Sequence, residues 1–206
     1  MKKIKVCKYL AVAAVLLASV YTTQAQEKLQ FKIGYNISTP VGKFSDNISK
    51  TSFRGFTAEL AYPVTSRLQV GLGILYNDYY QKYARQVYAT QHGAVSAVLT
   101  NSIQTMPVLA KVNYNLTKEG LVKPYVSVGA GGNLITYKQY LGEFPYNKTA
   151  LRPAVNGDAG VNIALGKTKT AGLNLGANFN YLPFKFNGID NLNNWGAHAG
   201  IFFALH

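Results

Sequence analysis

Histidine is the side chain in this sequence best suited to act as a catalytic base, and the 206 residues contain three of them, His92, His198 and His206. A nucleophilic site needs such a base within hydrogen-bond reach of a hydroxyl or thiol. His198 falls on the polar side of an alternating segment, His206 ends the sequence, and His92 has only Ser96 loosely near it. We therefore predict that the protein is not an enzyme. Metal-ligand spacings and phosphate-binding loops are also missing from the sequence, so we expect no metal and no cofactor.

Four isolated charges interrupt segments that otherwise alternate apolar and uncharged residues: Lys32, Glu59, Lys111 and Asp158. Charges that face one another inside a protein can carry protons or ions, or they can form a structural ion-pair cluster. Which chemistry applies depends on how wide a space the surrounding elements enclose.

A third group of residues suits recognition rather than catalysis. The stretch from Asp78 to Ala97 is predicted to be a long loop, and aromatic and arginine side chains of this kind are enriched in protein interfaces. We interpret it as a loop binding surface made of Tyr79, Tyr80, Lys82, Tyr83, Arg85 and Tyr88.

The elements that must position these residues are strands. Apolar and polar residues alternate with a period of two in eight segments, about 29–38, 55–62, 68–77, 102–114, 125–137, 155–163, 173–181 and 195–205, as expected for strands whose two faces meet different surroundings. No segment after the N-terminus has helical periodicity, so lipid is the remaining partner for the apolar face. We predict an all-β fold, an eight-stranded antiparallel up-and-down transmembrane β-barrel of the OmpA/OmpX type. A soluble lipocalin-like barrel is the alternative, but inner faces rich in glycine and asparagine disfavour a dry ligand cavity.

The connections between these strands alternate in length. Long ones are expected at 39–52, 78–97, 138–151 and 183–194, and short turns between them, which places both termini on the periplasmic side. Aromatic residues gather at two depths, as interfacial girdles do. The girdle at the short turns would contain Tyr62, Tyr114 and Phe203, and the girdle at the long loops Tyr76, Tyr137, Tyr181 and Trp195.

A barrel of eight strands has a lumen just wide enough for side chains to fill it. We therefore expect the four charges to meet there as a structural plug, with a proton or ion path as the functional alternative.

The N-terminal residues have the pattern of an export signal: a lysine-rich start, an apolar run and a small-residue cleavage pattern. We predict a signal peptide over residues 1–25, cleaved after Ala25, a barrel domain over 26–206, and location in the outer membrane of a Gram-negative bacterium. The signal contains Cys7, the single cysteine, and four lysines, so the mature chain keeps 17 basic and 8 acidic residues, a net charge of +9. These charges are scattered, which argues against nucleic acid and fits loops that face anionic outer-membrane lipids.

One hairpin carries a family resemblance. Met106–Lys111, followed by Lys123–Gly131, resembles the PorT-like porin-family proteins of the Bacteroidetes, in which a proline-containing strand leads through a short turn to Lys-Pro-Tyr-Val and a glycine-rich strand. The resemblance implies an outer-membrane barrel and, through the family name, a component of a secretion apparatus.

The last segment resembles the assembly signal of outer-membrane barrels, with His198, Gly200, Phe203 and Leu205 at its positions. This implies recognition by the barrel-assembly machinery. The function that we expect is that of a small non-enzymatic barrel with a structural or surface-binding role. The alternatives are a secretion component, with an unknown surface or secretion partner, and a lipid A-modifying enzyme.

Overall fold

The computed structural model describes residues 29–90, 93–141, 144–166, 169–186 and 189–205. The predicted signal peptide, His92 and His206 lie outside this part of the chain. The elements that build the wall are β1 (Gln30–Pro40), β2 (Ser52–Pro63), β3 (Leu68–Lys82), β6 (Leu99–Asn115), β7 (Val122–Leu141), β8 (Phe144–Leu165), β9 (Ala171–Tyr181) and β12 (Asn194–Ala204).

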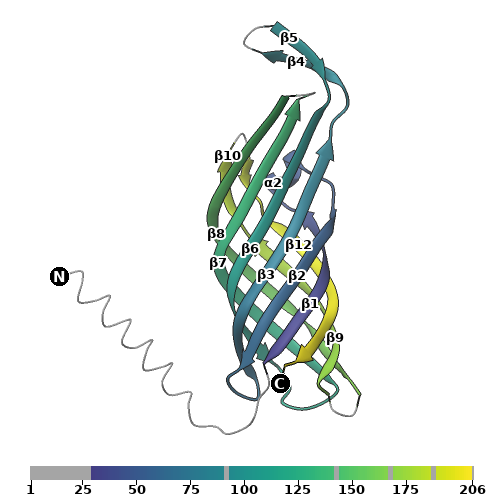
Figure 1. The fold of residues 1–206 in the computed structure, drawn as a ribbon, viewed down its shortest axis with the longest axis vertical. Coiled ribbons are helices and arrows are strands. Elements are labelled where there is room, and N and C mark those ends of the chain that lie inside the picture. The colour runs from purple at the N-terminus through teal and green to yellow at the C-terminus, as the bar shows by residue number, and fades with distance from the viewer. Residues whose placement is uncertain (1–28, 91–92, 142–143, 167–168, 187–188, 206) are drawn as a thin grey trace, which may run out of the picture.

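Within the described residues, these eight strands form one closed antiparallel barrel in which β1 pairs with β12 (Figure 1). The predicted fold class is therefore confirmed. Short turns join β2 to β3, β6 to β7 and β8 to β9 at the end where the C-terminus lies. Short turns mark the periplasmic end of such barrels, so the opposite end faces outward from the cell.

The alternation seen in the sequence sets which face each side chain joins. On β6, Lys111 and Asn113 are buried inside while Val108 and Val112 are about 40% exposed on the outside. The barrel exterior carries many such exposed apolar side chains, for example Val128 at 64%, as expected for a surface that faces lipid. No described helix has the length and apolar character needed to cross a membrane.

The wall has unequal height. β1, β9 and β12 have 11 residues each, whereas β6, β7 and β8 have 17, 20 and 22, so a sheet of long strands rises beyond the rest of the barrel (Figure 1). On this protruding sheet the polarity of the two faces reverses: Ser102 and Lys138 face outward, and Ile103 and Ile135 face inward. A polar exterior around an apolar interior is the pattern of a protein in water, so this part of the wall stands outside the bilayer.

The inner face of the protruding sheet packs against the loops that cross the barrel mouth. These loops contain the five-residue helix α2 (Lys43–Asn47) and the small hairpin of β10 (Pro183–Phe186) and β11 (Ile189–Asn191). Their apolar side chains and those of the sheet form one buried cluster, the apolar plug, which comprises Phe44, Ile48, Tyr79, Ile103, Leu109, Ile135, Tyr137, Ala154, Leu182, Phe184, Ile189 and Leu192. The plug covers the extracellular end of the lumen.

The structure corrects several sequence-based expectations at this end. Most of the predicted loops 78–97 and 138–151 are strand: β3 continues to Lys82, and the register of β7 with β8 continues to Leu141 and Phe144. Tyr137, predicted in the outer aromatic girdle, is 1% exposed and faces inward. The alternation of side chains continues above the membrane, but the apolar residues change faces there, and that change hid the strands. The helix α2 was not expected either.

Candidate functional site

The structure brings the four predicted lumenal charges together in the middle of the barrel. Lys32 Nζ lies 3.0 Å from Glu59 Oε1, Lys111 Nζ lies 2.7 Å from Glu59 Oε2, and the same Lys111 Nζ lies 3.3 Å from Asp158 Oδ2. All four side chains are at most 8% exposed. Two bases and two acids cancel, so the cluster is neutral overall.

Glu59 is the centre of this cluster. Besides the two lysines, its Oε1 accepts a hydrogen bond from Asn113 Nδ2. Three donors on one carboxylate offset the loss of hydration that a buried charge suffers. This arrangement is typical of a structural ion pair rather than of a carboxylate that binds a ligand.

Tyr125 extends the cluster toward β9 and β12, a role that sequence reasoning did not single out. Its hydroxyl lies 3.4 Å from Asp158 Oδ1, 3.2 Å from His198 Nε2 and 3.2 Å from Asn174 Nδ2. Its ring lies under Lys32, with Nζ 5.1 Å from the centroid. The only sequence signal was its place on the polar side of the β7 alternation.

A ladder of amides continues from this cluster toward the apolar plug. Asn178 Nδ2 donates to Asn36 Oδ1 at 3.0 Å, and Asn36 Nδ2 donates to Asn77 Oδ1 at 2.8 Å. Asn180 donates to Asn178 and to Asn194, both at 2.9 Å. The repeated asparagines at alternate positions of the strands were the signal for this ladder, although their mutual pairing was not predicted.

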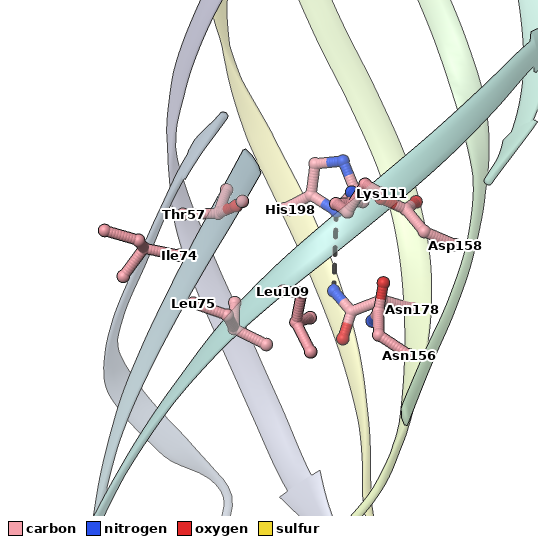
Figure 2. Close-up of a pocket in the computed structure, with 10 residues that line it drawn as sticks. Thr57, Ile74, Leu75, Leu109, Lys111, Asn156, Asp158, Asn178 and His198 are labelled. Atoms are coloured by element: carbon pink, nitrogen blue, oxygen red, sulfur yellow. Dashed lines mark hydrogen bonds and ion pairs between the residues drawn. The ribbon is translucent and has the colours of Figure 1, made fainter. Parts of the chain in front are cut away.

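A small cavity of about 20 Å³ lies where the ion cluster meets the ladder (Figure 2). Lys111, Asp158, His198 and Asn178 border it, and Leu109 closes it toward the plug. This space holds about one water molecule, which is too small for an organic substrate.

His198 lies in this region and takes part in the lumenal hydrogen-bond network. In the described chain its ring nitrogens contact the Tyr125 hydroxyl and, at 3.5 Å, the Asn178 amide. Tyr125 and Asn178 are both buried, at 3% and 4% exposed. The histidine is thus part of the hydrogen-bond network that links the ion cluster to the asparagine ladder.

The predicted tyrosine-rich binding surface is divided by the structure. Tyr79 is fully buried, donates to or accepts from Ser38 Oγ at 2.7 Å and packs edge-on against Phe44, so it belongs to the plug. Tyr80, in contrast, is 44% exposed and lies under the Arg54 guanidinium.

The remaining residues of that surface are also separated. Lys82 and Arg85 are exposed, and the Tyr83 hydroxyl donates to the Asn47 carbonyl. Tyr88 lies on β4 (Gln86–Thr90), which pairs with β5 (Gly93–Ala97) in a hairpin that stands away from the barrel (Figure 1). The six residues therefore do not form one continuous patch.

The expected assembly signal lies on β12, the strand that closes the barrel, and on Leu205 directly after it. His198 faces the lumen, Phe203 contacts Phe31 with ring centroids 5.3 Å apart, and Leu205 is 39% exposed. Gly200 pairs with Gly34 of β1 at the closure, where an added Cβ would lie 2.2 Å from the Ile33 carbonyl oxygen. The barrel thus requires a glycine at this position whether or not the strand is also recognised during assembly.

One further feature of the protruding sheet was not predicted: β8 has a free edge. β9 pairs with β8 only as far as Tyr181 and Val155, and no described residue pairs with residues 146–153 on that side. The Ala164 N–H bonds the Leu121 carbonyl on the β7 side, and the register with β7 has no break. Even-numbered N–H groups of β8 therefore face β7 and odd-numbered ones face the free edge.

Comparison with solved structures agrees with this architecture. The chain is similar to neisserial surface protein A, with 16% identity, a TM-score of 0.56, and coverage of 88% of this chain and 98% of that one. It is also similar to the outer membrane protein OprG of Pseudomonas aeruginosa, with 12% identity, a TM-score of 0.56, and coverage of 87% and 96%. At these identities the likeness concerns the fold alone.

Sequence comparison identifies the family. No curated protein matches the chain. The family model described as outer membrane protein beta-barrel domain matches residues 10–203, nearly the whole sequence. With a closed eight-stranded barrel that is apolar outside and polar inside, the chain belongs to the outer membrane protein beta-barrel domain family.

Proposed function

We propose that this protein is a non-enzymatic outer-membrane barrel that displays a rigid sheet for binding an extended peptide segment of a surface partner. The observation that carries the proposal is the free edge of β8 on the protruding sheet. An exposed strand edge presents unpaired backbone groups that an added strand can satisfy.

The body of the barrel is better suited to support than to transport. Ion pairs and amides fill the lumen, and the apolar plug covers its outer end. The plug also holds the inner face of the protruding sheet in place, so the sheet is stiff where a partner would bind. A rigid site binds with a smaller loss of conformational entropy than a mobile loop.

The edge has a defined hydrogen-bonding pattern. Its odd-numbered residues Asn147, Thr149 and Leu151 direct their N–H groups away from β7, and Pro153, which has no N–H, ends the row. The side chains of these three residues are exposed on the outer face. A partner strand can therefore form a short ladder that is limited at one end by the proline.

Charge selects the kind of partner. Lys148 and Arg152 lie on the inner side of the same strand; Lys148 Nζ sits 3.7 Å from the centroid of the Phe186 ring, and Arg152 is exposed. An extended segment with acidic side chains at alternate positions complements these two cations.

A second copy of this chain in the same membrane does not fit the edge. The two-fold axis of such a dimer would run along the membrane normal. Both β8 strands would then run in the same direction across the membrane, so they could not pair antiparallel. Because barrel strands tilt by about 35–45°, a parallel pairing would cross at a wide angle instead.

A matched pair of variants tests the proposal. Thr149→Pro removes an N–H on the free edge without breaking a bond to β7, whereas Thr149→Ala keeps that N–H and removes only the side chain. Extended acidic peptides selected on the purified protein in nanodiscs should bind the alanine variant normally and the proline variant at least 10-fold more weakly. Equal binding to both variants would reject the edge as the site.

The hairpin resemblance supports a second candidate function. Met106–Lys111 and Lys123–Gly131 lie on neighbouring strands β6 and β7, as the PorT-like pattern implies. For a secretion component we expect co-purification with other envelope proteins and loss of a secreted product when the gene is deleted. Normal secretion in the deletion strain would leave peptide binding as the function.

A further inference from the structure

A second cavity, unrelated to the β8 edge, opens at the periplasmic end of the barrel. Its volume is about 310 Å³, within the lower range of small-molecule sites. Short-turn residues such as Thr65 and Lys169 border its mouth, and Phe202, which is 5% exposed, contributes an apolar surface.

The charged residues of this cavity are all basic. Lys123 and Lys169 line it, and no aspartate or glutamate does so among the described residues. The ion cluster deeper in the lumen is neutral, because Lys32 and Lys111 face Glu59 and Asp158. The cavity is therefore electropositive and favours an anionic ligand.

A buried polar atom in the wall also lacks a partner. Gln69 is 5% exposed, and its Nε2 donates to Gln30 Oε1 at 3.1 Å. Its Oε1 is buried and accepts no hydrogen bond from the described residues, although the side chain lines the cavity. Leaving a buried acceptor unpaired costs on the order of 1–3 kcal/mol, so turning the Gln69 amide toward the cavity to accept a hydrogen bond from a ligand N–H would remove that cost.

We propose that the periplasmic cavity binds the free carboxylate end of a short peptide. The carboxylate lies between Lys123 and Lys169, a peptide N–H donates to Gln69 Oε1, and a small apolar side chain packs on Phe202. An inorganic phosphate would satisfy the lysines but would bring neither an amide N–H nor an apolar group. The observations therefore favour a peptide over a simple anion.

Titrations of the full mature protein in nanodiscs test this inference. The probe is acetyl-trialanine with a free carboxylate, compared with its C-terminal amide, with inorganic phosphate and with an analogue that has an ester oxygen in place of its last amide N–H. The acid should bind at least 10-fold more tightly than the amide and than phosphate, and more weakly as salt rises. The ester analogue should bind about 3–10-fold more weakly than the acid, because it lacks the N–H that forms one hydrogen bond.

Variants assign the contacts. Lys123→Gln and Lys169→Gln should each weaken binding several-fold, whereas Lys118→Gln, a matched change on an exposed turn residue outside the cavity, should not. Gln69→Met should bind the acid and the ester analogue equally, because the acceptor is gone. All variants must still show the heat-dependent gel shift of a folded barrel.

Three outcomes would overturn the proposal: no saturable binding of acetyl-trialanine, equal affinity for the acid and the amide, or equal weakening by Lys118→Gln. Binding of phosphate as tight as that of the peptide would reduce the cavity to a general anion site. Because the β8 edge lies at the other end of the barrel, Thr149→Pro should leave these titrations unchanged.

Discussion

The change Glu59→Gln tests the lumenal cluster directly, because it removes one charge and keeps the shape of the side chain. Lys111 retains Asp158 at 3.3 Å after this change, but Lys32 loses the one carboxylate that it contacts among the described residues and keeps the uncharged amide oxygen and the face of Tyr125, 5.1 Å away. The cost therefore arises chiefly from Lys32, which is 6% exposed and would be left as a buried cation without an acid.

The expected size follows from this asymmetry. Breaking a buried pair by removing one partner costs roughly 3–5 kcal/mol. The glutamine oxygen can still accept a hydrogen bond and Lys111 keeps Asp158, so we expect Glu59→Gln to cost about 2–3 kcal/mol of the free energy of unfolding. Lys111→Met should cost about 3–5 kcal/mol, because it deprives both Glu59 and Asp158 of a partner.

A second substitution separates the contributions. Adding Lys32→Met to Glu59→Gln removes the unpaired cation, so the double variant should be about 1–2 kcal/mol more stable than the sum of the single changes predicts. Adding Lys111→Met to Glu59→Gln should also destabilise less than the sum of the two single changes. This double variant stays destabilised, because Asp158 then lacks its lysine.

Unfolding in urea, followed by the fluorescence of Trp195, provides the measurement. Trp195 is the single tryptophan and is 56% exposed on the outer face, so unfolding moves it from lipid to water. A loss of 2–3 kcal/mol should lower the urea midpoint by about 1 M for a slope of about 2–3 kcal/mol/M. Ala58→Val, on the opposite face of the same strand, is the control and should change the midpoint little. If Glu59→Gln unfolds like the parent while Ala58→Val destabilises strongly, the energetic role assigned to the cluster is wrong.

Four further results are expected. The protein should fractionate with the outer membrane and migrate on a detergent gel according to whether it was boiled, since a closed barrel resists cold detergent; recovery in the soluble periplasmic fraction would contradict this. Planar bilayers should show no stable conductance of porin size, because side chains fill the lumen and the plug covers it. Ile135→Ala, inside the plug, should cost about 2–5 kcal/mol in the same urea assay, whereas lipid-facing Val128→Ala should be nearly neutral. The exposed ion pair between Lys43 on α2 and Asp190 on β11 lowers the pKa of Asp190 below its ordinary 3.8 and raises that of Lys43 above 10.5. Hydrogen exchange of the Ile48 N–H, which donates to the Phe44 carbonyl at the end of α2, should report on this pair. The contribution of Asp190 is present above pH 3.8 and lost as pH falls through its lowered pKa, and that of Lys43 is lost as pH rises through its raised pKa. The protection factor of this N–H, which is its exchange rate corrected for the intrinsic rate at each pH, should therefore fall at both extremes, and Asp190→Asn should remove the fall in acid.

The residue pattern alone was sufficient for the membrane-embedded part of the barrel. Alternation with a period of two assigned Lys32, Glu59, Lys111 and Asp158 to the inside, and the structure places all four there in contact. The physical reason is that a strand directs successive side chains to opposite faces, while lipid and a narrow lumen accept opposite kinds of side chain. A strand in such surroundings therefore reveals its orientation in its sequence.

The extracellular end required the tertiary structure. Above the bilayer the wall is surrounded by water, so Ile103 and Ile135 face inward, and the apolar pattern no longer marks the outer face. The loops with Phe44 and Leu192 cover those inner residues through contacts distant in sequence, which no local period encodes. The free edge of β8 exists because β9 ends at Tyr181, before β8 does. The oxygen of Gln69 has no described partner because no donor lies within reach. Both features depend on how the barrel is assembled, which the sequence pattern does not encode.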